Sequence, residues 1–345
     1  MTSLNHLVDS IDPTWARYRD NFPRQVLGVT RYLEAQIMER LTGEFGFLNL
    51  RLYYEPYISL VSQKGTRLTD ISGALGISRQ AANQTANQIE SAGYIQRVPD
   101  PTDGRAKHIV LTTRGLDLRQ RGLEVAERLE HECARIVGEK GLRDSTNALI
   151  ALCNEAKIVP PEMSESVNRN APLVGLLPRF SDYVSKRLMD LTINRGHGGL
   201  KLSYGQVLTL IGPEGGRILQ IAALHNVSKQ AISSIASELE EHGYIYREQD
   251  PADARQVLLR FTGLGRKLLD DSVNSIDDLE AELRACIGPE SLECLRTAMK
   301  KLYHVLQPET GVFTHSAPDI NQLAQELRKQ LSRESCEQLS ALLLK

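Results

Sequence analysis

The chain has 345 residues, which allows two or three domains of ordinary size. Its apolar fraction of 41% and charged fraction of 24% are typical of a globular protein, and its net charge of −2 gives no overall basicity that would indicate nucleic acid. The N-terminus lacks the basic start and apolar core of a signal peptide, and no apolar run approaches the ~20 residues that span a membrane. With five widely spaced cysteines, which suit reduced thiols, these features favour a cytoplasmic protein.

Helical spacing dominates the first half of the chain. Residues 1–22 form an extension in which 14–20 are expected to be a short packing helix that carries Trp15, the only tryptophan. Apolar residues at three- and four-residue spacing predict a helix over 24–45. Shorter helices are expected at 54–62, 67–75 and from Ser78, followed by strands at 94–98 and 107–111 and helices at 114–137 and 142–155.

The chain then repeats itself. The stretch 78–105 recurs at 228–255 with a constant offset of 150, and the identical pairs include Ser78 with Ser228, Gly93 with Gly243, and Arg105 with Arg255. The second copy predicts helices at 176–193, 204–211, 217–224, 265–285 and 289–306, and strands at 244–248 and 256–261. We expect Ser203 and Gln206 to form a capping box. A last amphipathic helix is expected at 319–344.

These elements define the expected domains. They are an N-terminal extension (1–22), a first domain (23–156), a linker rich in Pro, Ser and Asn (157–174), a second domain (175–307) and a C-terminal extension (308–345). Within each domain a helix, a tight turn at Gly76 or Asn226 and a further helix capped by serine make a helix-turn-helix. The inner face of the further helix is expected at Ala81, Thr85 and Ile89 in the first copy and at Ala231, Ile235 and Leu239 in the second.

Several motifs at fixed spacing accompany that helix-turn-helix. They are Ile71 to Ser78, Gly-Tyr-Ile up to Arg97, the Asp-Pro-x-Asp-x-Arg turn at 100–105, and Leu-Thr-x-x-Gly at 111–115. The second copy departs from the pattern at His225, Asn226, Ala254 and Phe261. Each copy resembles a winged-helix domain of the MarR family of bacterial transcriptional regulators. The resemblance implies a mainly α fold with small β-wings, and two winged helix-turn-helix domains joined by a shared helical, dimerisation-type region as a single-chain pseudo-dimer.

The expected partner is double-stranded DNA. Outward polar groups on the helix that begins at Ser78 or Ser228 can contact phosphates and base edges, and Asn or Gln can pair bidentately with adenine. The predicted contact residues of the first copy are Arg67, Ser78, Arg79, Gln80, Asn83, Gln84, Asn87, Arg105 and Lys107. Those of the second copy are Arg217, Ser228, Lys229, Gln230, Ser233, Ser234 and Arg255.

The wings supply the second predicted contact. Arg105 and Arg255 lie at hairpin tips, where an arginine can enter a narrow minor groove and an aspartate two residues earlier can orient it. The first wing is the more basic, because Val257 takes the place of Lys107. Since the outward groups of the two copies differ, we expect a two-part operator with unlike halves about one helical turn apart, in which the first copy dominates affinity.

The resemblance also implies that a small aromatic effector can release the DNA. Tyr53, Tyr54, Tyr57 and Tyr204 lie near where such a pocket would form, although tyrosines at this spacing are more often core residues. His197, in a glycine-rich loop, is expected to be solvated, and Cys286 and Cys294 to be buried thiols. We expect no metal, no cofactor and no catalytic site. The alternative function is a winged-helix scaffold for protein partners, with weak or no DNA binding.

Overall fold

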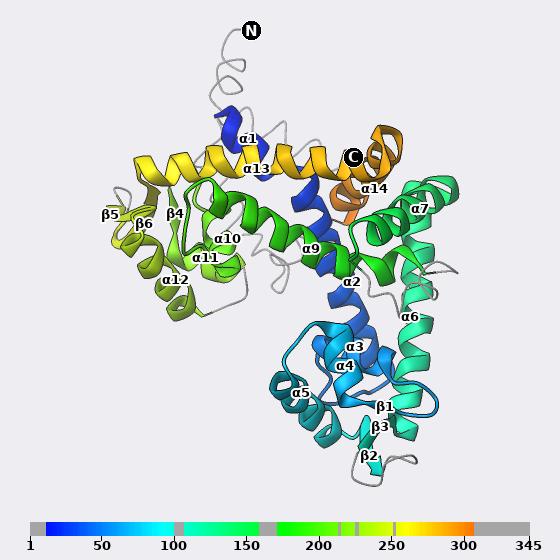
Figure 1. The fold of residues 1–345 in the computed structure, drawn as a ribbon. Coiled ribbons are helices and arrows are strands. Elements are labelled where there is room, and N and C mark those ends of the chain that lie inside the picture. The colour runs from blue at the N-terminus through cyan, green and yellow to red at the C-terminus, as the bar shows by residue number, and fades with distance from the viewer. Residues whose placement is uncertain are drawn as a thin grey trace, which may run out of the picture.

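The computed structural model describes residues 12–99, 107–158, 171–212, 215–224, 228–250 and 253–306. The expected helix at 319–344 and most of the linker therefore lie outside the described residues. Two similar sets of elements follow one another along the chain. In space, each set places a winged unit at the far end of a pair of long helices (Figure 1). Within the described part, no helix is both long and apolar enough to cross a membrane.

The first set begins after a short helix, α1 (Pro13–Arg19). Its elements are α2 (Phe22–Gly43), η2 (Leu52–Tyr54), α3 (Glu55–Leu60), β1 (Thr66–Arg67), α4 (Leu68–Leu75), α5 (Arg79–Ser91), β2 (Ile95–Pro99), β3 (Lys107–Leu111), α6 (Thr113–Val137) and α7 (Glu139–Glu155). The second set comprises α9 (Leu173–Asn194), α10 (Leu202–Leu208), β4 (Gly216–Arg217), α11 (Ile218–Leu224), α12 (Lys229–Glu241), β5 (Ile245–Asp250), β6 (Asp253–Phe261), α13 (Gly263–Ile287) and α14 (Pro289–Leu306). The chain is thus mainly helical with small antiparallel sheets, as the sequence predicts.

The helix-turn-helix forms from the residues that predict it. Gly76 ends α4 in the left-handed conformation, with φ of 63°, which glycine adopts without steric cost. The Ser78 hydroxyl then caps α5 by accepting a hydrogen bond from the Ala81 backbone N–H at 3.1 Å. Ser228 caps α12 in the same way through Ala231, also at 3.1 Å, whereas Asn226 lies outside the described residues.

In α5 and α12, two of the three residues on the buried face lie one position after the predicted ones. Ala82, Ala86 and Ile89 are buried in α5 while Ala81 is exposed, and in α12 the buried residues are Ile232, Ala236 and Leu239. Both candidate stripes have helical spacing, and the sequence offers small or apolar residues on each. The packing of α5 against α4 and β2 selects between them. The outward Asn83, Gln84 and Asn87 stay exposed under either choice.

Each wing is a hairpin with a short third strand. The sheet orders are β1-β3-β2 and β4-β6-β5, and all pairs are antiparallel. The hairpins confirm the predicted strand pairs, although β6 starts at Asp253, three residues before its predicted start. The two-residue strands β1 and β4 had no signal in the sequence, because period-two alternation cannot be read from two residues. They connect the helix-turn-helix to the hairpin.

The Leu-Thr-x-x-Gly motif is the junction between wing and long helix. The Thr112 hydroxyl accepts from the Gly115 N–H at 3.0 Å, which caps α6, and donates to the Gly93 carbonyl at 2.7 Å. A Cβ on Gly115 would lie 1.9 Å from the Tyr94 carbonyl oxygen, so the close approach requires glycine. Thr262 and Gly265 repeat the arrangement at the start of α13.

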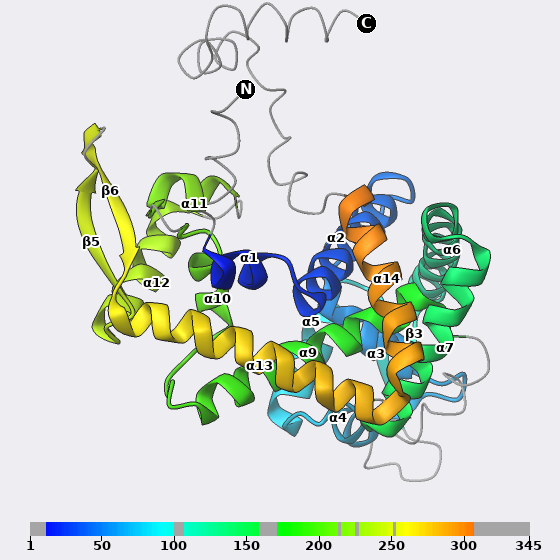
Figure 2. The ribbon, with the colours of Figure 1, turned by 90° about the horizontal axis from the view of Figure 1, so that it is seen from above.

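Long helices from both sets share one core. Helix α2 packs against α9 and α14, and α7 packs against α14 and α13, so the first and last helices of each copy interlace (Figure 2). One continuous apolar cluster runs from Phe22 and Phe180 at the centre to Ile89 and Tyr94 in the first winged unit. The apolar faces that lack a partner within their own copy are therefore covered by the other copy.

The second winged unit has a core of its own. Tyr204, Ile232 and Leu259 belong to a separate cluster, to which the N-terminal extension contributes Trp15. The Trp15 side chain is 7% exposed, and its ring centroid lies 6.2 Å from that of Phe261. Helix α1 packs along α13 beside this unit, which confirms the expected packing helix (Figure 2).

One predicted cap is wrong. Helix α10 begins at Leu202 with Lys201 at its N-cap, and no side chain caps it. Ser203 lies within the first turn instead of before it. The Lys201 ammonium is held 2.6 Å from the Glu238 carboxylate, which ties the start of α10 to α12 in place of a capping box.

Candidate nucleic-acid interface

The predicted contact residues of α5 and α12 lie at equivalent positions in the two winged units. In α5 and its cap the residues Ser78, Arg79, Gln80, Asn83, Gln84 and Asn87 are all exposed. In α12 and its cap Ser228, Lys229, Gln230 and Ser234 are exposed, and Ser233 is half-buried. Each winged unit therefore offers one capped helix with an outward polar face. The side chains on that face differ between the copies.

An arginine of β2 is fixed against the outward face of α5. The Arg97 guanidinium pairs with Glu90 through Nη1, and its Nη2 donates to Asn83 Oδ1 at 3.1 Å and to Asn87 Oδ1 at 2.8 Å. The Arg97 backbone N–H also donates to Glu90 at 2.9 Å. The charge of Arg97 is thus paired within the protein, so Arg97 adds no net basicity to the wing.

Arg247 repeats the contact with different partners. Its Nη1 lies 2.5 Å from Glu240, while its Nη2 donates to the Ser237 hydroxyl at 3.0 Å and to the Ser233 carbonyl at 3.2 Å. The sequence contained a signal for this site, because Glu90 and Glu240 match at the same offset as the two arginines. The pairing itself could not be read from that repeat.

Most residues of the two wing tips lie outside the described residues. Arg105 is not among the described residues, nor is Asp103, and nothing is described of the Arg255 side chain. Lys107 is exposed at the start of β3. Arg217 is half-buried, and its Nε donates to the buried Asp250 carboxylate at 2.6 Å. Arg67 is half-buried at the start of α4.

The four predicted pocket tyrosines do not form one site. Tyr54 and Tyr57 are core residues of the first winged unit, and Tyr53 is exposed with its hydroxyl donating to Gln88 Oε1 at 2.8 Å. Tyr204 alone lines a large cavity, and its hydroxyl donates to Glu238 at 2.8 Å. These positions fit the expectation that tyrosines at this spacing are more often core residues than pocket residues.

That cavity, of about 660 Å³, lies between the second winged unit and the shared helices. Leu27, Leu188, Leu208 and Leu268 give it apolar walls, and its cations are Arg19, Arg24, Arg31 and Lys201. No carboxylate is among the described residues that line it. Burial raises the pKa of the lining Tyr18 to about 12, so that this phenol stays neutral.

The two cavity arginines of α2 have no basic counterparts in α9. Helices α2 and α9 are equal in length and begin at Phe22 and Leu173, so within this pair the offset is 151, and Arg24 and Arg31 correspond to Gly175 and Asp182. The equivalent positions of α9 therefore carry no guanidinium group.

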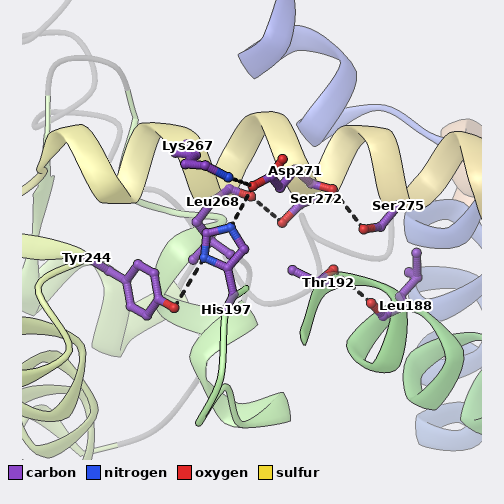
Figure 3. Close-up of polar contacts among 9 residues, drawn as sticks. All are labelled: Leu188, Thr192, His197, Tyr244, Lys267, Leu268, Asp271, Ser272 and Ser275. Atoms are coloured by element: carbon purple, nitrogen blue, oxygen red, sulfur yellow. Dashed lines mark hydrogen bonds and ion pairs between the residues drawn. The ribbon is translucent and has the colours of Figure 1, made fainter. Parts of the chain in front are cut away.

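His197 is buried, and the expectation of a solvated histidine is wrong. Its ring is 2% exposed, with Nδ1 at 3.3 Å from the Tyr244 hydroxyl and Nε2 at 2.8 Å from Asp271 Oδ2. Lys267 also pairs with Asp271, so a loop, a strand end and α13 meet at one polar cluster (Figure 3). Phe47 has the matching position in the first copy and is buried against Tyr94, so the polar cluster belongs to the second copy.

The four cysteines that the structure describes show no common site. Cys133 and Cys153 are buried, and burial raises the pKa of their thiols to about 12 and about 11. Cys286 is exposed and Cys294 is half-buried, so the expectation of two buried thiols is wrong for Cys286. Within the described ranges, no group of three or more histidine, cysteine or acidic residues could hold a metal ion.

The fold and this surface define a protein with two winged helix-turn-helix units. Residues 60–106 match one MarR-family model and residues 206–257 match another, each covering a helix-turn-helix and part of its wing. The chain thus carries two MarR-family matches in tandem, one in each winged unit.

Solved structures of single-copy proteins match part of the chain. Wild-type MarR of E. coli in its apo form is 21% identical, covers 39% of this chain and 98% of its own, and has a TM-score of 0.34. CouR of Rhodococcus jostii RHA1, bound to p-coumaroyl-CoA, is 26% identical over 41% of this chain and 93% of its own, with a TM-score of 0.33. A MepR mutant of S. aureus bound to an oligodeoxyribonucleotide is 22% identical over 38% and 96%, with a TM-score of 0.29. The comparison with curated proteins finds no match.

Proposed function

We propose that this protein is a sequence-specific, double-stranded DNA-binding transcriptional regulator that reads two unlike half-sites. The observation that carries the proposal is the pair of serine-capped helices α5 and α12, which lie at equivalent positions in the two winged units. Their exposed polar faces differ in composition. Such a helix fits the major groove, where polar side chains distinguish base pairs.

The unit that binds is one chain. In this proposal the first domain (23–156) and the second domain (175–307) act as the two protomers of a pseudo-dimer, joined by the linker 157–174 and flanked by the extensions 1–22 and 308–345. The interlaced α2, α7, α9 and α14 support it, because their apolar faces are covered within the chain. A tether keeps the second reader at an effective concentration of order mM once the first is bound.

The proposal is tested by titrating duplex DNA in gel-shift experiments at several salt concentrations. Selection from random duplexes should yield two halves about one helical turn apart and unlike in sequence. Arg105→Ala should weaken binding more than its matched counterpart Arg255→Ala, because the first wing also has Lys107. A palindromic selected site, or equal losses, would count against unlike readers.

The same titration separates the alternative function. A scaffold for protein partners would show no salt-dependent affinity for any duplex. A regulator should lose affinity steeply as salt rises, because its phosphate contacts release counterions.

We further propose that the protein acts as a repressor that one small aromatic anion releases from DNA. The cavity beside the second winged unit supports this, since its apolar walls suit an aromatic ring and Arg24, Arg31 and Lys201 suit a carboxylate. Ligand bound there contacts both the winged unit and the shared helices, so it can change the spacing of the two readers.

The test compares benzoate with its neutral analogue benzamide. Benzoate should weaken duplex binding by the wild-type chain at concentrations where benzamide has no effect. The variant Arg24→Val with Arg31→Ser removes both guanidinium groups and should lose this response. Its affinity for DNA without ligand is the control, and an unchanged benzoate response in the variant would rule out the cavity.

A further inference from the structure

Carboxamide oxygens on the outward face of α5 are held by donors of the protein itself. Asn83 Oδ1 and Asn87 Oδ1 both accept from Arg97 Nη2, and Gln88 Oε1 accepts from the Tyr53 hydroxyl at 2.8 Å. A guanidinium group has donors only, so the atom that faces Arg97 must be the amide oxygen. The amide nitrogen of each asparagine, with its two hydrogens, is then directed away from Arg97.

The support for Arg97 is rigid enough to set this orientation. Its guanidinium and its backbone N–H both bond to Glu90, one turn further along α5 than Asn87, and its side chain is only 18% exposed. Arg97 therefore bridges β2 and α5 with three acceptors on one helix face. Hydrogen bonds between a charged group and neutral partners are among the stronger ones in proteins.

The second copy keeps the arginine and has no amide group at the positions of Asn83, Asn87 and Gln88. The Ser237 hydroxyl accepts from Arg247 and donates to the Ser233 carbonyl at 3.0 Å, so it has no hydrogen left to offer. Glu238 stands where Gln88 stands in the first copy, and a carboxylate that accepts from Lys201 and Tyr204 has nothing to donate. The matched glutamate–arginine pair thus holds two faces of opposite chemistry.

On the basis of the proposed DNA-binding function, we propose that Arg97 is a positioning residue for base specificity, which leaves Asn83 and Asn87 only their amide hydrogens to offer and so makes these two contacts select guanine over adenine. Guanine presents two acceptors, N7 and O6, in the major groove, and an amide NH2 group can donate to both. Adenine presents N7 beside the N6 donor, which an NH2 group cannot satisfy. In the bidentate asparagine–adenine pair the amide oxygen accepts from adenine N6, whereas here that oxygen already accepts from Arg97 Nη2 and is turned toward the protein.

The experiment starts from the duplex that the full-length wild-type chain selects. At the base pairs contacted by Asn83 and Asn87, guanine is replaced by adenine or by 7-deazaguanine, which lacks the N7 acceptor, and affinities are measured by fluorescence anisotropy. We expect wild type to prefer guanine roughly tenfold, the size of one good base contact. Arg97→Met should reduce this preference or shift it toward adenine, because the freed oxygens can accept from N6.

Two further variants separate positioning from simple support. Asn87→Asp keeps an acceptor for Arg97 but has no hydrogens to donate, so it should lose the guanine preference at its base pair while its melting temperature stays near that of wild type. Arg97→Lys keeps one cationic donor and should restore part of the preference. Arg247→Met is the matched control and should leave the preference of the first half-site unchanged.

Some results would overturn the inference. If Arg97→Met weakens binding to every duplex by the same factor with a shallower salt dependence, Arg97 is a phosphate contact. If Arg97→Met does not fold, Asn87→Asp and Arg97→Lys decide the question, and an unchanged guanine preference in Asn87→Asp rejects it. Failure of wild type to bind any selected duplex would instead reject the proposed function.

Discussion

At the scale of single residues, the two copies differ most in which polar groups are buried. The buried His197 pairs with the half-buried Asp271 where the first copy has Phe47 and Arg121. Burial alone would raise the pKa of Asp271, but hydrogen bonds from Lys267 and His197 outweigh it and hold that pKa below its usual value. The carboxylate form therefore stabilises the folded second unit.

This pair predicts a stability that depends on pH. Because the folded pKa of Asp271 lies below the unfolded one, its stabilising contribution is present at neutral pH and is lost as pH falls through the folded value, below about 4. Asp271→Asn should unfold more easily in urea at pH 7, by about 1–3 kcal/mol, and the difference from wild type should shrink toward pH 3. The exposed neighbour substitution Asp270→Asn is the control, and parallel pH curves for wild type and Asp271→Asn would contradict the assignment.

At the scale of elements, each long helix depends on one glycine at its start. Gly115 and Gly265 lie against the carbonyl oxygens of Tyr94 and Tyr244, at Cβ distances of 1.9 and 2.0 Å if a side chain were added. The wing and the long helix can meet only where that side chain is absent. The repeated Thr-x-x-Gly thus has a structural reason in both copies.

Two glycines of α6 make a matched test of this junction. Gly115→Ala should destabilise the protein by about 3 kcal/mol or more, because the backbone must shift to admit the methyl group. Gly122→Ala, in the same helix with nothing within 4 Å of the added Cβ, should stabilise it by about 0.5–1 kcal/mol. Thermal melting of the two variants measures both, and equal effects would mean that the junction adapts.

The elements themselves were predicted well from the sequence, and the failures have physical causes. Helix and strand periods located α2, α6, α9, α13 and both hairpins within a few residues. The buried stripe of α5 was misplaced because Ala81 and Ala82 are both small, so only packing decides between them. The Arg97 contacts join residues 10 and 14 positions apart through a strand and a helix, a relation that no local pattern encodes.

At the scale of the whole molecule, the two winged units are attached differently. The core of the first unit is continuous with the shared helices, whereas that of the second is a separate cluster completed by Trp15. The cationic cavity lies between that second cluster and the shared helices. The second unit therefore relies on the N-terminal extension for part of its packing.

Removal of Trp15 should affect one unit only. Trp15→Ala deletes a ring that is 7% exposed, and such a change costs about 3–5 kcal/mol when the site cannot collapse. Native-state hydrogen exchange should show faster exchange in β5 and β6 while β2 and β3 keep their protection. The first unit is the internal control, and equal acceleration in both would show one cooperative unit.

The interlaced helices also predict the state of assembly. Because α2 and α14 cover each other within one chain, sedimentation should give the mass of a single 345-residue chain. DNA titration should then reach saturation at one chain per two-part site. A two-chain species in sedimentation would assign a pairing role to the C-terminal helix expected at 319–344.

Covalent joining changes what a substitution can do. In a symmetric dimer of identical chains every change is made twice, so a reader cannot gain a donor, nor a cavity lose an arginine, on one side alone. Here Asn87 and Ser237, or Arg24 and Gly175, vary independently around the same glutamate–arginine pair and the same helix crossing. One half can hold a DNA sequence while the other half changes its preference or its sensitivity to ligand, so the two properties can be altered by separate mutations.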